Sequence, residues 1–187
     1  MKLAKNLERL GTESAFSILA EAKKLEAQGK EMIHLGLGQP DFKTPKHVVE
    51  AAKKAIDDGH HGYVLANGIL ECREAVSRKI KSLYKKDISP ERVMIMPGGK
   101  PTMYFAISMI GEPGAEIIHP TPGFPIYESM INYTGAKPVP YDLTEDKDLK
   151  FDPEKILSLI TDQTRLLVLI NPNNPTGSFV EKSKIDY

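Results

Sequence analysis

Leu166-Leu167-Val168-Leu169-Ile170, followed by Asn171-Pro172-Asn173-Asn174-Pro175-Thr176-Gly177, is the stretch that decides the fold. The continuous apolar run predicts a buried strand. Proline lacks an amide donor, and asparagine and glycine favour turns, so the next seven residues must leave the sheet sharply. In open α/β sheets, ligands bind at the carboxyl ends of the strands. The stretch therefore predicts a rigid loop at the ligand-binding edge of a sheet, with a plain tight turn as the alternative.

Strands alternate with helices through the second half of the chain. The helix before the last strand is expected to begin with Asp152 as its cap and Pro153 as its first residue. This alternation predicts an α/β fold with a mostly parallel sheet flanked by helices. The predicted strands are residues 93–96, 116–118, 137–143 and 166–170.

The first half of the chain is predicted to be helical. A first helix is expected from about Glu13 to Ala27, a second from about residue 45 to Gly59, and a third over residues 69–84. A boundary near residues 82–91 would divide the chain into residues 1–85 and 86–187. The second helix is expected to bury one apolar stripe, made of Val48, Val49, Ala52, Ala55 and Ile56.

Composition narrows the possible classes of protein. The 187 residues are 41% apolar and 27% charged, as is ordinary for a globular protein. Lys+Arg and Asp+Glu both number 25, so the charge does not favour nucleic acid as a partner. The single Cys72, the absence of a run long enough to cross a bilayer, and the lack of a signal peptide predict a cytoplasmic protein. No metal site is expected, because the adjacent His60 and His61 would point apart.

Three loops rich in proline and glycine follow predicted strands, so they are expected to meet at one edge of the sheet. In the first, Gly98-Gly99-Lys100 opens a helix, whose free amides and dipole suit an anion such as phosphate. In the second, Phe124 offers a flat ring for stacking, although it could be a core residue. In the third, Asn174 offers an amide. Together they predict a site for a phosphorylated planar aromatic molecule.

These motifs carry a resemblance to a known family. Gly36-Leu37-Gly38-Gln39-Pro40-Asp41-Phe42, Gly98-Gly99-Lys100 and Asn173-Asn174-Pro175-Thr176-Gly177 resemble the motifs of class I/II aminotransferases, in the family's order and spacing. The helix start from Asn67 to Ala75 is also similar, with Cys72 in place of a leucine. The resemblance covers essentially the whole chain. It implies the three-layer aspartate aminotransferase fold, with residues 1–85 holding part of the small domain and residues 86–187 the first half of the large, cofactor-binding domain.

The resemblance also implies a cofactor, pyridoxal 5'-phosphate, and roles for matching residues. The amides of Gly99 and Lys100 would hold its phosphate, and Phe124 would stack on its ring. Asn174 would hydrogen-bond its phenolic oxygen, and would meet the substrate carboxylate together with Gly38. Tyr63 would reach the phosphate of a neighbouring subunit, which implies a homodimer with shared sites.

Two peptide bonds are expected to follow the family pattern, and one small residue departs from it. The bonds 121–122 and 174–175 are expected to be cis by analogy. Gly123 replaces a commonly bulky residue, which would leave space near the substrate.

The resemblance implies transamination between an amino acid and a 2-oxo acid, most readily of the aspartate type. No catalytic residue is expected on this chain, because the family's catalytic Lys would lie beyond Tyr187. The parent protein is expected to be about twice as long, and the chain alone to be inactive. Two alternatives stay open, a carbon–sulfur β-lyase of the same fold and a catalytically dead module for dimerisation or regulation.

Overall fold

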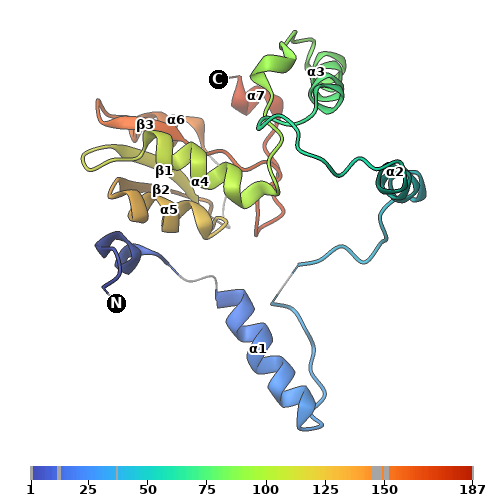
Figure 1. The fold of residues 1–187 in the computed structure, drawn as a ribbon. Coiled ribbons are helices and arrows are strands. Elements are labelled where there is room, and N and C mark those ends of the chain that lie inside the picture. The colour runs from blue at the N-terminus through green and yellow to red at the C-terminus, as the bar shows by residue number, and fades with distance from the viewer. Residues whose placement is uncertain (1, 12–13, 37, 145–148, 150–151, 187) are drawn as a thin grey trace. The chain divides into compact units, whose positions relative to one another are not determined.

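The computed structural model describes residues 2–11, 14–36, 38–144, 149 and 152–186. Glu13, the expected start of the first helix, and Leu37 of the first motif lie outside the described residues. The chain divides into two compact units, one of residues 1–17 and 99–187 and the other of residues 18–98. In Figure 1 the elements are η1 Lys5–Arg9, α1 Ser14–Ala27, α2 Lys46–Asp57, α3 Leu70–Tyr84, η2 Pro90–Arg92, α4 Gly99–Ile110, β1 Glu116–Thr121, α5 Ile126–Thr134, β2 Lys137–Asp142, α6 Pro153–Ser158, β3 Thr164–Leu167 and α7 Lys182–Ile185.

The first unit is built on a parallel sheet with strand order β2-β1-β3. Ile118 of the central strand lies opposite Val139 of β2 and Leu167 of β3. Ile117 and Ile118 are completely buried, because helices cover both faces of the central strand. This arrangement confirms the predicted α/β fold.

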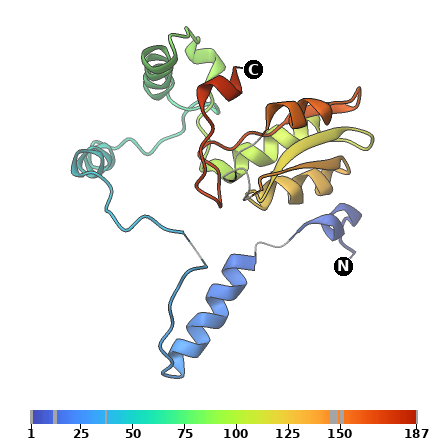
Figure 2. The ribbon, with the colours of Figure 1, turned by 180° about the vertical axis from the view of Figure 1, so that it is seen from behind.

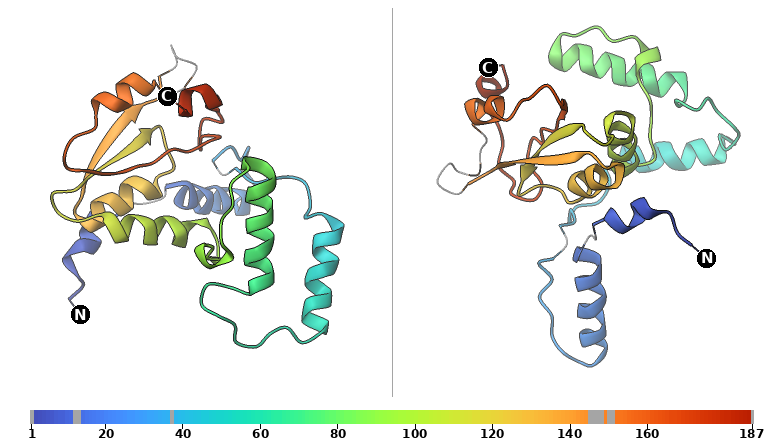
Figure 3. Two further views of the ribbon diagram at one scale, coloured as in Figure 1. Left: turned by 90° about the horizontal axis from the view of Figure 1, so that it is seen from above. Right: turned by 90° about the vertical axis from the view of Figure 1, so that its left-hand side faces the viewer.

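Helices lie on both faces of the sheet (Figure 3). On one face, Ile117 packs with Ile107 of α4 and with Met130 and Ile131 of α5. On the other face, Ile118 packs with residues of β2 and with Ile156 of α6. Successive residues of a strand point to opposite faces, so one Ile-Ile pair serves both cores. The fold is therefore three-layered.

Local sequence signals account for the helix ends in this unit. The Asp152 side chain accepts a hydrogen bond from the amide of Glu154 at 3.1 Å, and Pro153 is the first helical residue of α6, as predicted. Gly135 ends α5 with a φ of 87°, a conformation that suits glycine. These caps fix the lengths of the connections between strands.

One predicted strand is wrong. Residues 93–96 form no strand, and the amide of Ile95 donates to the carbonyl of Asn67 at 3.1 Å in place of a sheet partner. An apolar run becomes a strand only when another strand pairs with it, and none does within the described residues. The last strand was predicted too far along the chain, since β3 covers Thr164–Leu167. The amide of the next residue, Val168, still donates to the carbonyl of Ile118 at 2.9 Å.

The second unit contains α2 and α3. In this unit Arg73 is buried, with 5% of its surface exposed. It donates from Nε to the carbonyl of Gly68 and from Nη1 to the carbonyl of Pro90, both at 3.0 Å. The predicted burial of the apolar stripe on α2 is wrong, because α2 has no buried residue; Val48 is 46% exposed and Ile56 70%. An amphipathic pattern identifies one face of a helix but does not guarantee that the same chain covers it.

Candidate functional site: the loops at the carboxyl end of the sheet

The first loop ends in the start of α4. Gly98 has a φ of 98°, and its amide donates to the carbonyl of Met96 at 2.8 Å, which turns the chain into the helix at Gly99. Among the described residues, a methyl group added at Gly99 would meet the Met103 Cε atom, at 3.8 Å, and no other atom within 4 Å, so the backbone is open there to an incoming group. The first turn of a helix presents amides that have no partner within the helix, and its dipole favours an anion. The local geometry therefore suits a phosphate.

Lys100 connects the first loop with the second. Its Nζ atom lies 5.6 Å from the centre of the Phe124 ring, and Phe124 belongs to the loop after β1. The same Nζ atom lies 5.3 Å from the ring of Phe16 on α1. Both distances are within the range of cation–π attraction. The structure thus brings the start of α4 and the Phe124 ring together, as the sequence predicts.

No sequence pattern singles out Phe16. It stands in the first turn of a helix whose apolar stripe is made of other residues, and no local pattern separates it from an ordinary exposed residue. Its 51% exposure agrees with a position outside the core. Only the approach of Lys100 identifies it.

The second loop, residues 121–125, is shaped by close backbone contact. The bond between Thr121 and Pro122 is cis, as expected. A Cβ atom on Gly123 would lie 2.4 Å from the carbonyl oxygen of Pro120. The expectation that Gly123 leaves space is therefore wrong for the position of its own side chain, which the backbone already fills. A larger residue at position 123 would therefore require this turn to shift.

The third loop, residues 171–177, assigns different positions to its asparagines. Asn173 is 7% exposed, and its Oδ1 atom accepts hydrogen bonds from the amide of Thr176 at 3.2 Å and from its hydroxyl at 2.9 Å. Asn171 exchanges side-chain hydrogen bonds with the backbone of Val180. Asn174 is exposed. The bond between Asn174 and Pro175 is cis, as expected, and so is that between Asn171 and Pro172, which the sequence analysis did not predict.

These two loops share one edge of the sheet because β1 and β3 are parallel neighbours. The carboxyl ends of parallel strands lie side by side, so the loops containing Phe124 and Asn174 follow adjacent strands. The chain between β3 and α7 can be followed in Figure 2. The hydrogen bonds of Asn173 hold this loop and leave the neighbouring amide at the surface.

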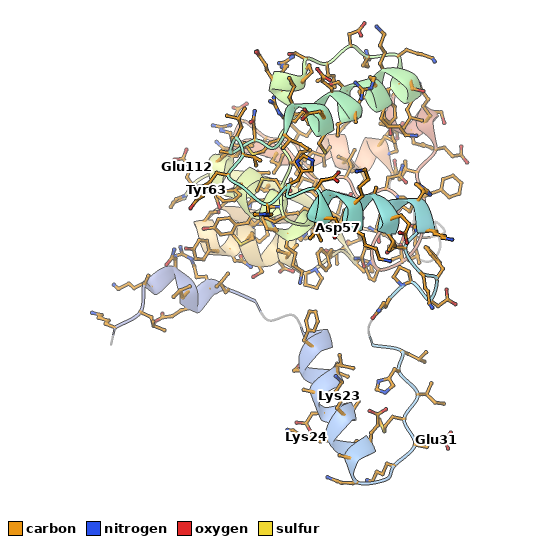
Figure 4. The ribbon with its side chains drawn as sticks, turned by 45° about the vertical axis from the view of Figure 1, so that its right-hand side comes forward. Lys23, Lys24, Glu31, Asp57, Tyr63 and Glu112 are labelled. Atoms are coloured by element: carbon orange, nitrogen blue, oxygen red, sulfur yellow. The ribbon has the colours of Figure 1, made fainter. Side chains whose placement is uncertain are left out.

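Gly38 and Tyr63 belong to the second unit, and both are exposed. Figure 4 shows Tyr63 in the connection between α2 and α3. The site geometry described above is that of Gly99, Lys100, Phe124 and Asn174, all in the first unit.

Two buried titratable side chains, His119 and Tyr141, lie on strands β1 and β2. Burial lowers the pKa of His119, with smaller opposing effects from the Glu128 charge and a hydrogen bond to the backbone of Pro120. Burial raises the pKa of Tyr141 to about 12, and its hydroxyl donates to the carbonyl of Val168 at 3.1 Å. Burial therefore favours the neutral form of both side chains. His119 was not singled out from the sequence, where it is one polar residue at the end of a short apolar run.

The described residues contain no group of three or more His, Cys, Asp or Glu side chains able to hold a metal ion. No helix in the described part of the chain is both long and apolar enough to cross a membrane. A helix start for an anion, a flat ring and an exposed amide fit a phosphorylated aromatic cofactor such as pyridoxal phosphate.

Comparison with known proteins identifies the family. The model of the class I and II aminotransferases matches residues 30–186. The chain is 34% identical over 177 residues to the aspartate aminotransferase of Bacillus subtilis, covering 95% of this chain and 45% of the relative. It is 35% identical over 185 residues to the (5-formylfuran-3-yl)methyl phosphate transaminase of Methanocaldococcus jannaschii, covering 99% and 48% respectively. The chain spans about half the length of the curated relatives it matches.

The solved structures agree with the sequence relatives. The Thermus thermophilus aspartate aminotransferase with maleate matches with a TM-score of 0.93 at 31% identity, over 100% of this chain and 49% of that chain. The alanine aminotransferase of Pyrococcus furiosus matches with a TM-score of 0.92 at 32% identity, over 99% and 48%. The chain therefore belongs to the class I and II aminotransferases, the pyridoxal-phosphate enzymes of the aspartate aminotransferase fold.

Proposed function

We propose that this chain supplies part of the cofactor and substrate site of a pyridoxal-phosphate-dependent aminotransferase. The reaction is the transfer of an amino group from an amino acid to a 2-oxo acid. An aspartate-type reaction is favoured, because several of the relatives bear that name. The chain spans about half of those relatives, so the activity is proposed for the whole protein.

Gly99 and Lys100 bind the phosphate group in this proposal. The amides of the first turn of α4 point at the anion, and the helix dipole adds to their attraction. Lys100 adds a full positive charge at the same place. Pro101 has no amide to donate, but it stands in the first turn, where that amide would have no partner within the helix. The cost to the helix is therefore small, although Pro101 cannot donate a hydrogen bond to the phosphate.

Phe124 and Asn174 orient the bound ring. Phe124 stacks against one face of the ring, and the Asn174 amide donates to its phenolic oxygen and to the substrate carboxylate. When bound, the cofactor supplies an electron sink for the carbanion formed at the substrate. The residues of this chain supply binding and orientation, and the exposed position of Asn174 is what its role requires.

Gly38 and Tyr63 complete the proposal from the second unit. The amide of Gly38 binds the substrate carboxylate. The fully exposed Tyr63 reaches the phosphate in a partner subunit, so we propose a homodimer with shared sites. We place the protein in the cytoplasm, in amino-acid metabolism, because its single Cys72 needs no oxidising compartment.

The observation that carries the proposal is the 5.6 Å approach of the Lys100 Nζ atom to the Phe124 ring. It joins the helix start suited to phosphate with the ring suited to stacking, although 24 positions separate Lys100 and Phe124 in the sequence. Neither group alone is specific. Together they occupy adjacent places, as a phosphorylated ring requires.

The test uses the whole protein loaded with pyridoxal phosphate. Addition of aspartate is expected to shift the cofactor absorbance, and 2-oxoglutarate is expected to be converted to glutamate. Pyruvate and ammonia released from a sulfur-containing amino acid, without a new amino acid, would instead indicate a carbon–sulfur β-lyase. A protein that dimerises but shows no spectral change with any amino acid would be the non-catalytic module, and the proposal would be wrong.

A further inference from the structure

Ser178 and the end of the third loop are joined by a set of hydrogen bonds. The amide of Asn173 donates to the carbonyl of Ser178 at 2.7 Å, and the amide of Ser178 donates to the Thr176 hydroxyl oxygen at 3.2 Å. The Thr176 hydroxyl in turn donates to the Asn173 Oδ1 atom at 2.9 Å. All three bonds lie within residues 173–178, which we call the loop tip. They fix the shape of the loop tip but not its position on the sheet.

A further hydrogen bond joins the loop tip to another part of the chain. The Ser178 hydroxyl donates to the carbonyl of Leu149, which lies between β2 and α6, at 2.8 Å. The Leu149 amide donates to the carbonyl of Thr144 at 3.0 Å, and the Leu149 side chain packs against the buried cluster around Ile118. The Ser178 hydroxyl therefore connects the loop tip to the core of the sheet.

The base of the loop is held in a different way. The side chain of Val180 packs against the same cluster around Ile118. The side chain of Asn171 exchanges hydrogen bonds with the Val180 backbone, at 3.2 and 2.9 Å. Apolar packing is not directional, whereas a hydrogen bond favours one direction of approach. The bond from Ser178 to Leu149 therefore adds a directional contact at the loop tip.

We propose that Ser178 is a positioning residue for Asn174. Asn174 is an exposed member of the loop tip, next to the buried Asn173. An amide that is already held in place loses less conformational freedom when it binds a ligand. The inference rests on the proposed function, in which Asn174 donates to the phenolic oxygen of the cofactor. It predicts that affinity for this oxygen depends on a serine hydroxyl that does not touch the cofactor.

The first experiment titrates the whole protein, freed of its cofactor, with pyridoxine 5'-phosphate by calorimetry. The matched ligand is 3-deoxypyridoxine 5'-phosphate, which lacks the phenolic oxygen. Neither ligand has an aldehyde, so neither reacts with lysines. Ser178→Ala is expected to weaken binding of pyridoxine 5'-phosphate about fivefold, the size of one ordinary hydrogen bond. Binding of the deoxy ligand is expected to stay unchanged.

Three further variants accompany Ser178→Ala. Ser178→Thr keeps the hydroxyl and is expected to keep the wild-type affinity. Ser158→Ala removes an exposed serine hydroxyl that donates to the carbonyl of Lys155 within α6, at 2.6 Å, and is expected to bind as the wild type does. Thr176→Val removes another hydroxyl of the loop tip at similar volume, and is expected to lose affinity for pyridoxine 5'-phosphate alone. Circular dichroism of each variant establishes that it is folded.

A double-mutant cycle tests whether Ser178 acts through Asn174. In a protein that carries Asn174→Ala, the amide that Ser178 positions is gone. Adding Ser178→Ala is then expected to cause no further loss of affinity for pyridoxine 5'-phosphate. A merely structural role of Ser178 predicts the same loss with and without the Asn174 amide.

The outcomes separate the two ideas. A wild-type protein that binds neither phosphate ester, or an Asn174→Ala variant that binds both as the wild type does, would contradict the proposed function itself. A loss in Asn174→Ala together with full affinity in Ser178→Ala would overturn this inference alone. Equal losses for both ligands in Ser178→Ala, or an undiminished further loss when Asn174→Ala is already present, would also overturn it.

Discussion

The Asn173 Oδ1 atom accepts two hydrogen bonds from Thr176, from its amide at 3.2 Å and from its hydroxyl at 2.9 Å. The amide of Gly177 also donates to the Asn173 carbonyl at 2.8 Å, which closes the turn. Asn173 is thereby committed to the loop, and its neighbour Asn174 remains at the surface. Two identical adjacent side chains therefore differ in environment, since one is buried and hydrogen-bonded within the loop and the other is exposed.

Asn173→Ala is expected to lower the free energy of unfolding by about 1–3 kcal/mol, because it leaves the part-buried donors of Thr176 without their acceptor. Denaturant unfolding measures the change. Asn174→Ala is the matched control and is expected to change stability by no more than about 0.5 kcal/mol, as is usual for an exposed position. Equal losses in both variants would contradict the structural role of Asn173.

Asn174→Ala is expected instead to weaken cofactor binding by the whole protein about tenfold, the size of one hydrogen bond to a charged group. A donated hydrogen bond stabilises the phenolate, so its loss should move the pH of the cofactor's absorbance change upward. A spectrophotometric pH titration checks this. An unchanged titration midpoint would remove Asn174 from the site.

Gly123→Ala is expected to destabilise the protein by about 1–3 kcal/mol, because its methyl carbon would lie 2.4 Å from the Pro120 carbonyl oxygen. The turn must shift, so Phe124 should move and cofactor affinity should fall as well. Gly62→Ala is the control, since no atom of the described residues lies within 4 Å of its added carbon. Thermal unfolding of the two variants provides the comparison, and equal melting temperatures would argue against the steric explanation.

Arg73→Lys is expected to cost about 1–3 kcal/mol of stability despite keeping the charge. The planar guanidinium reaches two carbonyls, those of Gly68 and Pro90, and an ammonium cannot match that fork. Arg78→Lys on the same helix serves as control, because Arg78 makes an exposed ion pair with Glu74 at 3.6 Å, which contributes little to stability. Denaturant unfolding is the measurement, and similar midpoints for the two variants would contradict the structural role of Arg73.

His119 is expected to make stability depend on pH. Its pKa is lowered on folding, so the unfolded chain binds the proton more readily. The contribution of His119 is complete above its ordinary pKa of 6.5 and declines as the pH falls through 6.5 toward the folded pKa. The stability difference between wild type and His119→Gln should shrink from pH 8 to pH 5 in thermal unfolding. A constant difference would show that His119 does not titrate differently in the two states.

Much of this protein could be predicted from short stretches of sequence. Asp152 and Pro153 predicted the start of α6, and the strand and loop around residues 166–177 predicted a ligand edge. These signals are local, since a cap or a turn depends on a few neighbouring residues and their backbone preferences. The motifs at residues 36–42, 98–100 and 173–177 carried the family resemblance, which the family match confirms.

Other features depended on partners that are distant in sequence. Among the residues that the structure describes, no strand pairs with the apolar residues 93–96, and no residue of α2 is buried. The sequence does not show that a Cβ atom at Gly123 would meet the carbonyl oxygen of Pro120. Strand pairing and the burial of a helix face each require two surfaces. The sequence of one segment shows only one of the two.

The sequence by itself therefore determined the class of fold, the loops that face the ligand edge, and the kinds of chemical group they carry. Only the tertiary structure decided that Asn173 holds the loop while Asn174 stays at the surface, and that Phe16 lies against Lys100. The difference arises from the distance along the chain over which each kind of interaction acts. Backbone preferences act over a few residues, whereas hydrogen bonds and ring contacts between separate elements exist only after the sheet and its helices have brought them together.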